Sequence, residues 1–322
     1  MPLVIRTNIE SMIVQKNLAA ATNALDISIE RMTTGYRINH AGDNAANYSI
    51  SNNWVKQLSS LDVVVDNTAM GKDMLSTAED NYSLITTHLE RIRDLTEQAS
   101  SGTYGSASLK AIQAEIKSRL QEITRVAENA NFNGISLMGS TTNYTNGIDI
   151  QVGLDNTNNS KINLPSNLFS NATVNGLFSS DSAFMAIVTA ANGGTAISDL
   201  NTEDGYTAVA AAFSGLKKSG NTFVIQTDPN CKPSKTLSSL DTAIDGLVAR
   251  NTSLGASQNR MDSAADALTI QIQNVTSSLS TIRDTDVAAE SSAYIQAQIL
   301  QQASTTLLAT ANQMPSVALN LI

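Results

Sequence analysis

The sequence of 322 residues has little of the chemistry on which enzymes depend. It contains one cysteine, Cys231, and two histidines, His40 and His88. One cysteine excludes an intramolecular disulfide framework and a metal site built from cysteines, and two histidines leave little for acid–base or metal chemistry. Motifs for phosphate loops, zinc proteases and serine nucleophiles do not occur. We therefore expect a protein that is not an enzyme and that uses no metal and no cofactor.

Aromatic residues and positive charge are also scarce. Phe, Trp and Tyr make up 4% of the chain, the formal net charge is −9, and the pI is about 4.7. Nucleic-acid binding requires clustered Lys and Arg side chains, so we expect no nucleic-acid partner.

Proline is rare, and its positions divide the chain. The five prolines are Pro2, Pro165, Pro229, Pro233 and Pro315. Helix interiors exclude proline, so the proline-free stretches 3–164 and 234–314 are candidates for two long helical arms. The segment between them, 166–235, has a Gly-Gly pair and the β-like run "NTFVIQT". This composition predicts a small, separate domain or insertion of mixed α/β structure.

The last stretch of the chain, from Ser291 to Ile322, contains no charged residue. Glutamines and asparagines interrupt it throughout, whereas a membrane span needs roughly 20 mostly apolar residues. We therefore expect no membrane insertion. The first residues, "MPLVIRTNIESMIVQKNLAAA", lack the basic and continuous apolar regions of a cleaved signal peptide. Both ends are predicted to be buried against protein.

The second arm repeats apolar residues at alternating spacings of three and four, which is typical of a coiled coil. This predicted seam comprises Leu237, Leu240, Ile244, Leu247, Asn251, Leu254, Gln258, Met261, Ala265, Leu268, Ile272, Val275, Leu279 and Ile282, and continues in the same register through Asp286, Ala289, Ala293, Gln296, Leu300, Ala303, Leu307, Thr310 and Met314. We expect a break or bend at Asp286 and another at Gly255.

The first arm has a matching seam at its start. Its positions are Val14, Leu18, Ala21, Leu25 and Met32. The run "GYRINHAGDNAAN" then interrupts the helix. Two further helices are predicted, one through Ile85, Leu89, Ile92 and Ala99, the other through Ile112, Ile116, Leu120, Ile123 and Ala127. "SSGTYGS" is the loop between them, and "IDIQVGLDNTNNSKINL" is predicted to be a β-hairpin.

The fold predicted from these patterns is mainly α, a long antiparallel helical rod or coiled coil of the two arms, with a β-hairpin and the central insertion. Ile295, Ile299 and Leu308 lie off the seam, so the last helix is apolar on more than one face. Neighbouring copies of the chain would have to cover the excess. The residues predicted to mediate self-assembly are Val14, Leu18, Ala21, Leu25, Met32, Leu300, Ala303, Leu307 and Met314.

The chain resembles the bacterial flagellins, the subunits of the flagellar filament. Near the N-terminus the similar motifs are "RINHAGDNAAN", "LERIRDLTEQASSGT" and "IQAEIKSRLQEITRVAENANFNGISL"; near the C-terminus they are "LGASQNRM", "IRDTDVAAESS" and "QILQQASTTLLATANQMP". The resemblance covers roughly 1–164 and 236–322 and leaves out the middle. Asn44 and Asn47 depart from the usual Asp and Gly of the family's pattern.

The resemblance implies a domain layout. Residues 1–40 and 284–322 would form an inner coiled coil around a central channel. Residues 41–165 and 236–283 would form an outer-tube domain that includes the β-hairpin, and 166–235 would be a variable domain on the filament surface. In this layout Cys231 lies in an exposed loop. Both histidines are expected to be plain surface or loop residues.

The resemblance also implies partners and a location. The chain would be exported unfolded by the flagellar type III apparatus, with an export chaperone, and would meet the filament cap and hook-junction proteins in an extracellular filament. In flagellins sensed by Toll-like receptor 5, residues matching Arg91, Leu95 and Glu115 contact the receptor. Two alternatives stay open, a flagellin-like hook–filament junction protein and an enzyme carried on a flagellin scaffold.

Overall fold

The computed structural model describes residues 8–140, 144, 146–220, 222–225 and 232–319. The chain divides into two compact units. One is built from the two ends of the chain, up to Leu61 and from Thr269 onward, and the other spans Asp62–Leu268. The fold is mainly α, as the sequence predicts, with long helices at both ends and short β-hairpins in between.

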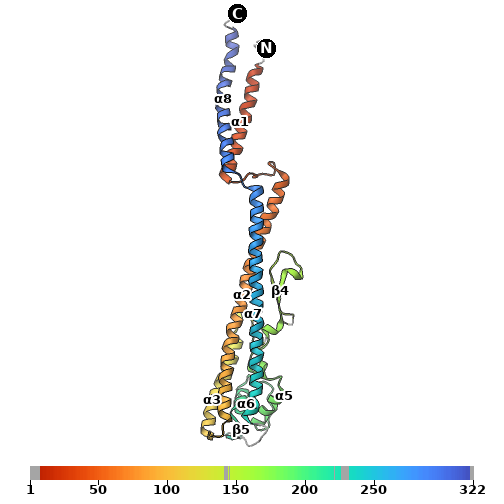
Figure 1. The fold of residues 1–322 in the computed structure, drawn as a ribbon, viewed down its shortest axis with the longest axis vertical. Coiled ribbons are helices and arrows are strands. Elements are labelled where there is room, and N and C mark those ends of the chain that lie inside the picture. Colours follow the sequence, from red (N-terminus) through yellow and green to blue (C-terminus); the bar gives the residue numbers. More distant parts are fainter. Residues whose placement is uncertain (1–7, 141–143, 145, 221, 226–231, 320–322) are drawn as a thin grey trace. The chain divides into compact units, whose positions relative to one another are not determined.

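In the first unit, helices α1 (Ile9–Thr34) and α8 (Val287–Leu319) lie side by side and antiparallel (Figure 1). The side chain of Asn8 caps the start of α1 by accepting a hydrogen bond from the Ser11 amide. Gly35 ends the helix with φ of 75°, a left-handed conformation that glycine adopts without a steric penalty. The predicted pairing of the two chain ends is confirmed.

Two short connectors in this unit are hydrogen-bonded to each other. The amide of Arg37 donates to the Arg283 carbonyl at 2.6 Å, and the Thr285 amide donates to the Gly35 carbonyl at 3.0 Å. The Arg37 guanidinium also donates to the Ile282 carbonyl at 2.7 Å, near the end of helix α7 (Pro233–Arg283), where a cation is favourable. The connectors correspond to the predicted interruption after α1 and the predicted break near Asp286.

The break predicted at Gly255 is wrong, because α7 runs through this residue without interruption. A glycine inside a helix costs only about 1 kcal/mol relative to alanine. Burial of Leu254 and Met261 on either side of Gly255 opposes that cost. Pro233 is the first residue of α7, a position where the missing amide hydrogen costs nothing.

The predicted seam holds in α7 and fails in α8. Every predicted position from Leu237 to Ile282 is buried or half-buried. In α8, by contrast, Ser291 is half-buried near the start, and the described positions that are covered at heptad spacing are Glu290, Tyr294, Ala297, Gln301, Ser304, Leu308 and Ala311. These lie one residue after the predicted ones, and Leu300 and Leu307 are 51% and 57% exposed. The reason is that residues 284–286 are not helical, so α8 starts with a new helical phase.

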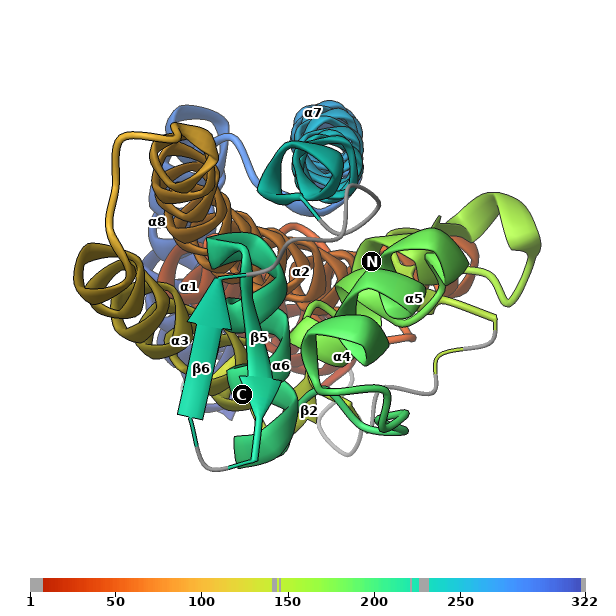
Figure 2. The ribbon, with the colours of Figure 1, turned by 90° about the horizontal axis from the view of Figure 1, so that it is seen from below.

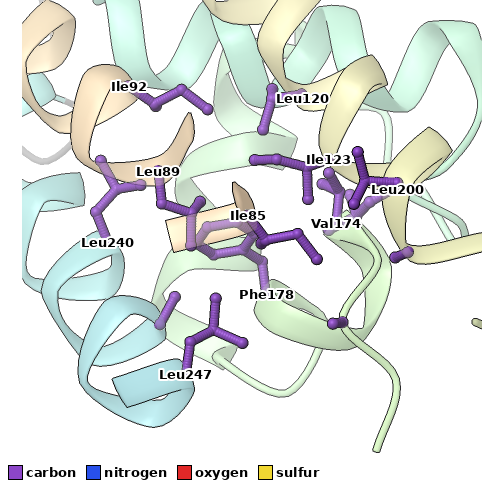
Figure 3. Close-up of a cluster of buried hydrophobic side chains, with 14 of the residues drawn as sticks. Ile85, Leu89, Ile92, Leu120, Ile123, Val174, Phe178, Leu200, Leu240 and Leu247 are labelled. Atoms are coloured by element: carbon purple, nitrogen blue, oxygen red, sulfur yellow. The ribbon is translucent and has the colours of Figure 1, made fainter. Parts of the chain in front are cut away.

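The second unit is built around α3 (Ser106–Asn129) and long segments of α2 (Ala45–Ser100) and α7. The two predicted helices and the loop between them are confirmed, although α2 begins much earlier than its predicted core segment. Figure 3 shows Ile85, Leu89 and Ile92 of α2 facing Leu120 and Ile123 of α3. All these side chains are fully buried.

Two β-hairpins follow α3. Strands β1 (Asn131–Phe132) and β2 (Ile135–Ser136) flank Asn133 and Gly134, whose φ values of 48° and 79° are typical of a tight hairpin turn. Strands β3 (Ile148–Gln151) and β4 (Lys161–Leu164) pair antiparallel, with Ile148 opposite Leu164. This second hairpin is the predicted one, and its connection contains the 3₁₀ turn η1 (Asn158–Ser160).

The middle segment lies within the second compact unit. It contains η2 (Ser166–Phe169), α4 (Val174–Phe178), α5 (Ser182–Ala191), α6 (Glu203–Ser214), β5 (Leu216–Ser219) and β6 (Thr222–Ile225). Strands β5 and β6 pair antiparallel beside α6 (Figure 2), which confirms the β-like run. Helix α6 packs on α3. Cys231 lies outside the described residues, so its predicted exposure stays a prediction.

The core of the middle segment is continuous with that of the long helices. Phe178, Phe184 and Phe213 stack within 5.0–5.8 Å of one another between ring centroids. They belong to the same buried cluster as Ile85 and Leu247 (Figure 3). A surface insertion with its own core was expected because the composition changes at 166, but composition does not show which apolar side chains share a core.

The Asp181 carboxylate connects the middle segment to α7 by a hydrogen bond, and this contact makes the stability of the fold depend on pH. Asp181 accepts hydrogen bonds from the Ser239 hydroxyl at 2.7 Å and from the amides of Ala183 and Phe184 at 3.0 Å. The Ser239 bond first, and then the amide bonds, lower the pKa of Asp181 below its ordinary value of 3.8. The stabilisation is therefore complete above the ordinary pKa and is lost as the pH falls through the lower, folded value.

We expect the free energy of unfolding of the wild-type chain to fall more steeply than that of Asp181→Asn as the pH is lowered from about 5 to about 2. Urea unfolding followed by circular dichroism at each pH measures this difference. Asp245→Asn, at an exposed position of α7, is the matched control. Parallel pH profiles for wild type and Asp181→Asn would contradict the assignment.

Candidate assembly surface

The most deeply buried apolar side chains between α1 and α8 are small, and the larger ones there are only half-buried. The buried residues of α1 are Ala21 and Ser28, and those of α8 include Ala297, Ser304 and Ala311. Burial of apolar area contributes about 25 cal/mol per Å², and alanine has little area to bury. The pair therefore gains little stability from its own interface.

Polar contacts at both ends of the pair fix its alignment. At one end the Asn8 side chain donates to the Ala311 carbonyl at 2.7 Å, and the Ser11 hydroxyl bonds the Asn312 side chain at 2.8 Å. At the other end Arg31 and Glu290 form an ion pair at 3.7 Å, with Glu290 buried. Such a pair specifies alignment more than it adds stability, because both ions lose water.

The outer faces of the pair are rich in large apolar side chains. The exposed ones are Ile9, Met12, Ile13, Ile27, Ile29, Met32, Val287, Ile295, Ile299, Leu300 and Leu307. Single exposed apolar residues are ordinary, but contiguous patches mark interaction sites. A helical pair that leaves this much apolar surface uncovered is a surface for association with protein.

One flank of the pair is hollowed into a groove of about 610 Å³. Small residues of both helices line it, among them Ala20, Ala24, Ala293 and Ala303. Leu300 and Leu307 also line the groove. We call this feature the flank groove.

The structure sorts the predicted assembly residues into two groups. Val14, Leu18 and Leu25 are half-buried and Ala21 is buried, as expected for the α1 side of the pair. Met32, Leu300, Ala303 and Leu307 are exposed on the outside of the pair. The sequence prediction placed them in the seam between the two helices instead. The side chain of Met314 lies outside the described residues. The "DTD" run at 284–286, where the helical phase resets, was the signal that could have corrected the register.

A second predicted site, on α2 and α3, is only partly at the surface. Arg91 and Arg119 both donate to Glu115, at 3.2 Å and 3.0 Å, and all three side chains are at least partly exposed. Partial burial works against the charged form of Glu115, but the bonds from Arg119 and Arg91 outweigh it and lower the pKa of the carboxyl. Leu95 is only 2% exposed and lies in the core, and its role as a receptor contact stays a prediction.

The two histidines differ in environment. His40 is exposed, as predicted, and its Nε2 lies 2.7 Å from a carboxylate oxygen of Glu30. His88 is half-buried instead of being a plain surface residue. Burial first, and then the charge of Arg119, lower the pKa of His88. The sequence pattern marks Leu89 as the core position of α2 and does not show that its neighbour His88 is also partly covered.

Among the described residues, none of the helices is both long and apolar enough to span a bilayer. Antiparallel terminal helices with apolar outer faces of this kind are typical of a structural protein that associates with other protein.

Comparison with known proteins identifies the family. Residues 5–143 match the bacterial flagellin N-terminal helical region, and residues 237–322 match the bacterial flagellin C-terminal helical region. Flagellin B of Vibrio cholerae is 31% identical over the whole of both chains. Flagellin C of Vibrio anguillarum is 29% identical over 99% of both, and polar flagellin F of Vibrio parahaemolyticus is 29% identical over 100% of both.

The chain therefore belongs to the bacterial flagellins, and it is a structural subunit of the flagellar filament. The full-length matches to flagellins do not favour the alternative of a hook–filament junction protein. The flagellins are a family of structural proteins, which agrees with the small number of potentially catalytic residues in the sequence.

Proposed function

We propose that this flagellin polymerises through the outer faces of α1 and α8, and that these helices reach their full stability only in the filament. The observation that supports the proposal is the set of large apolar side chains left uncovered on a pair whose fully buried apolar residues are only alanines. Contact with neighbouring copies would remove that area from water at about 25 cal/mol per Å².

Hydrogen exchange tests the proposal residue by residue. In the monomer, amides of α1 and α8 are expected to exchange fast, because a pair with few buried contacts opens locally at low cost. In the filament they are expected to become strongly protected, while the α2 and α3 segments of the core change little. Equal protection of α8 in monomer and filament would contradict a role for its outer faces in assembly.

The domain layout follows from the same proposal. Residues 1–40 and 284–322 would form the inner coiled coil, 41–165 and 236–283 the outer tube, and 166–235 the filament surface. Because the middle segment shares its core with α2, α3 and α7, we propose that it is displayed as part of the outer-tube body. Amine labelling of intact filaments at Lys217, an exposed residue of the middle segment, tests whether this segment faces outward.

We further propose that the chain is secreted, exported unfolded by the flagellar type III apparatus with a chaperone, and joined to the cap and hook-junction proteins at the filament ends. The poorly covered α1–α8 pair supports this, because helices with a thin interface unfold at little cost. Pull-down of the unfolded C-terminal helix by an export chaperone, lost when Ser291–Ile322 is removed, would test the chaperone step.

Recognition by Toll-like receptor 5 is a separate proposal, supported by the partly exposed cluster of Arg91, Glu115 and Arg119. The double variant Arg91→Ala, Glu115→Ala is expected to lower receptor signalling by the monomer at least about tenfold, since charged pairs at an interface are worth a few kcal/mol. A reporter-cell dose curve measures it. Lys110→Ala, exposed on α3, is the control. A dose curve unchanged by the double variant would reject receptor contact at this cluster.

A further inference from the structure

The chain contains four asparagines that are followed directly by glycine. The pairs are Asn133–Gly134, Asn146–Gly147, Asn175–Gly176 and Asn192–Gly193. An asparagine in this position can lose its side-chain nitrogen as ammonia, because glycine has no Cβ to keep its own amide nitrogen away from the asparagine side chain. The structure gives the four pairs different environments, and these decide which pair can react.

Two of the pairs are held by hydrogen bonds at the glycine amide. The Gly176 amide donates to the Thr173 hydroxyl at 3.3 Å, in the first turn of α4. The Gly193 amide donates to the Ala190 carbonyl at 3.2 Å, directly after α5. An amide nitrogen that is fixed in this way is turned away from the preceding side chain and retains its proton, so it is a poor nucleophile.

The pair of Asn146 and Gly147 is held by a hydrogen bond and by close packing. The Gly147 amide donates to the Tyr144 carbonyl at 3.0 Å. A Cβ placed on Gly147 would lie only 2.1 Å from the carbonyl oxygen of Leu164, at the end of β4. The backbone here is pressed against a strand and cannot rotate without separating the β3–β4 hairpin.

The pair of Asn133 and Gly134 is free of these restraints. Both residues are exposed, and among the described residues none forms a hydrogen bond with the Gly134 amide or the Asn133 side chain. No described atom lies within 4 Å of the position that a Cβ on Gly134 would occupy. Strands β1 and β2 on either side are only two residues long, so the turn opens locally at low cost.

We propose that Asn133 is a site of spontaneous deamidation in the folded chain. After loss of its proton, the Gly134 amide nitrogen attacks the side-chain carbonyl carbon of Asn133. A bond forms between these two atoms, the bond from that carbon to Nδ2 breaks, and ammonia leaves with a proton from water. The product is a five-membered cyclic imide. Water then opens the ring at one of its two carbonyls and gives aspartate or isoaspartate, with no oxidant or reductant required.

The reaction changes both the charge and the backbone of the turn. Asn133 and Asp149 line the same cavity of about 300 Å³, so the product adds a second carboxylate to it. Like charges at one site repel each other. In isoaspartate the main chain also passes through the side-chain carbon, and the longer backbone no longer fits a two-residue hairpin turn. We therefore expect deamidation to loosen the β1–β2 hairpin.

Peptide mapping of the aged wild-type chain tests the proposal. Purified full-length monomer is kept folded in mildly alkaline buffer, and samples are digested and sequenced by tandem mass spectrometry over time. Asn133 is expected to convert at least about tenfold faster than each of the other three asparagines, because only its turn opens without breaking a bond to the glycine amide. In urea, where the chain is unfolded, all four are expected to convert at similar rates. Enzymatic methylation of isoaspartate identifies the second product.

Two variants form a matched pair for isoelectric focusing of the aged protein. Asn133→Gln is expected to lose the acidic form that accumulates in the wild type, and Asn192→Gln is expected to keep it. In the folded wild-type chain, conversion of Asn133 no faster than that of the other three would overturn the proposal, and this measurement needs no variant to fold. None of these outcomes bears on polymerisation, so a failure here leaves the proposed function intact.

Discussion

Leu300→Asp is expected to abolish filament formation while leaving the monomer folded. Leu300 lines the flank groove and is half-exposed in the single chain, so a carboxylate there stays hydrated before assembly. In the filament the same carboxylate would be buried without a partner, which costs several kcal/mol per ion even after relaxation. A penalty of that size at every subunit contact shifts polymerisation by orders of magnitude.

The measurement has two parts. Circular dichroism and thermal unfolding of the monomer are expected to match wild type within about 0.5 kcal/mol, as for most surface substitutions. Sedimentation after seeding is expected to leave the variant in the supernatant. Leu300→Met, which keeps an apolar side chain of similar volume, is the control and should pellet with wild type. Normal pelleting of Leu300→Asp would show that the flank groove stays open to water in the filament.

Much of this architecture could be predicted from the sequence because helical period is a local property. The heptad positions of α7 from Leu237 to Ile282 match the buried positions, and the "IDIQ" and "KINL" runs pair as strands. These elements depend on side-chain spacing and turn residues within a few positions of each other.

The register of α8 could not be predicted in the same way. The sequence continues its heptad spacing through Asp286, so the pattern alone favoured Leu300 and Leu307 over Gln301 and Leu308 as the residues that face α1. Three non-helical residues break the phase, and spacing counted across them carries no geometric meaning. The polar and small residues that do face α1, such as Gln301 and Ser304, give no hydrophobic signal.

The candidate receptor cluster could also be predicted from the sequence only in part. Arg91 and Glu115 were placed at the surface correctly, because charged residues are rarely buried. Leu95 lies one helical turn after Arg91 on α2, but its side chain is buried in the core, which the resemblance does not show. Likewise, the change of composition at 166 could not show that Phe178, Phe184 and Phe213 join the core of the long helices.

Removal of Ser291–Ile322 has the largest expected effect, because it deletes nearly all of α8 and with it most of the flank groove and the partner of α1. The second compact unit, Asp62–Leu268, contains none of these residues and is expected to keep its helices and its cooperative unfolding. The truncated chain should therefore be folded and unable to polymerise.

Electron microscopy of seeded full-length and truncated protein, with circular dichroism of the same samples, tests the central claim most directly. We predict long filaments from the full-length chain, none from the truncated chain at any concentration tested, and strongly helical spectra from both. Filaments grown from the truncated chain would show that assembly does not depend on the outer faces of α1 and α8.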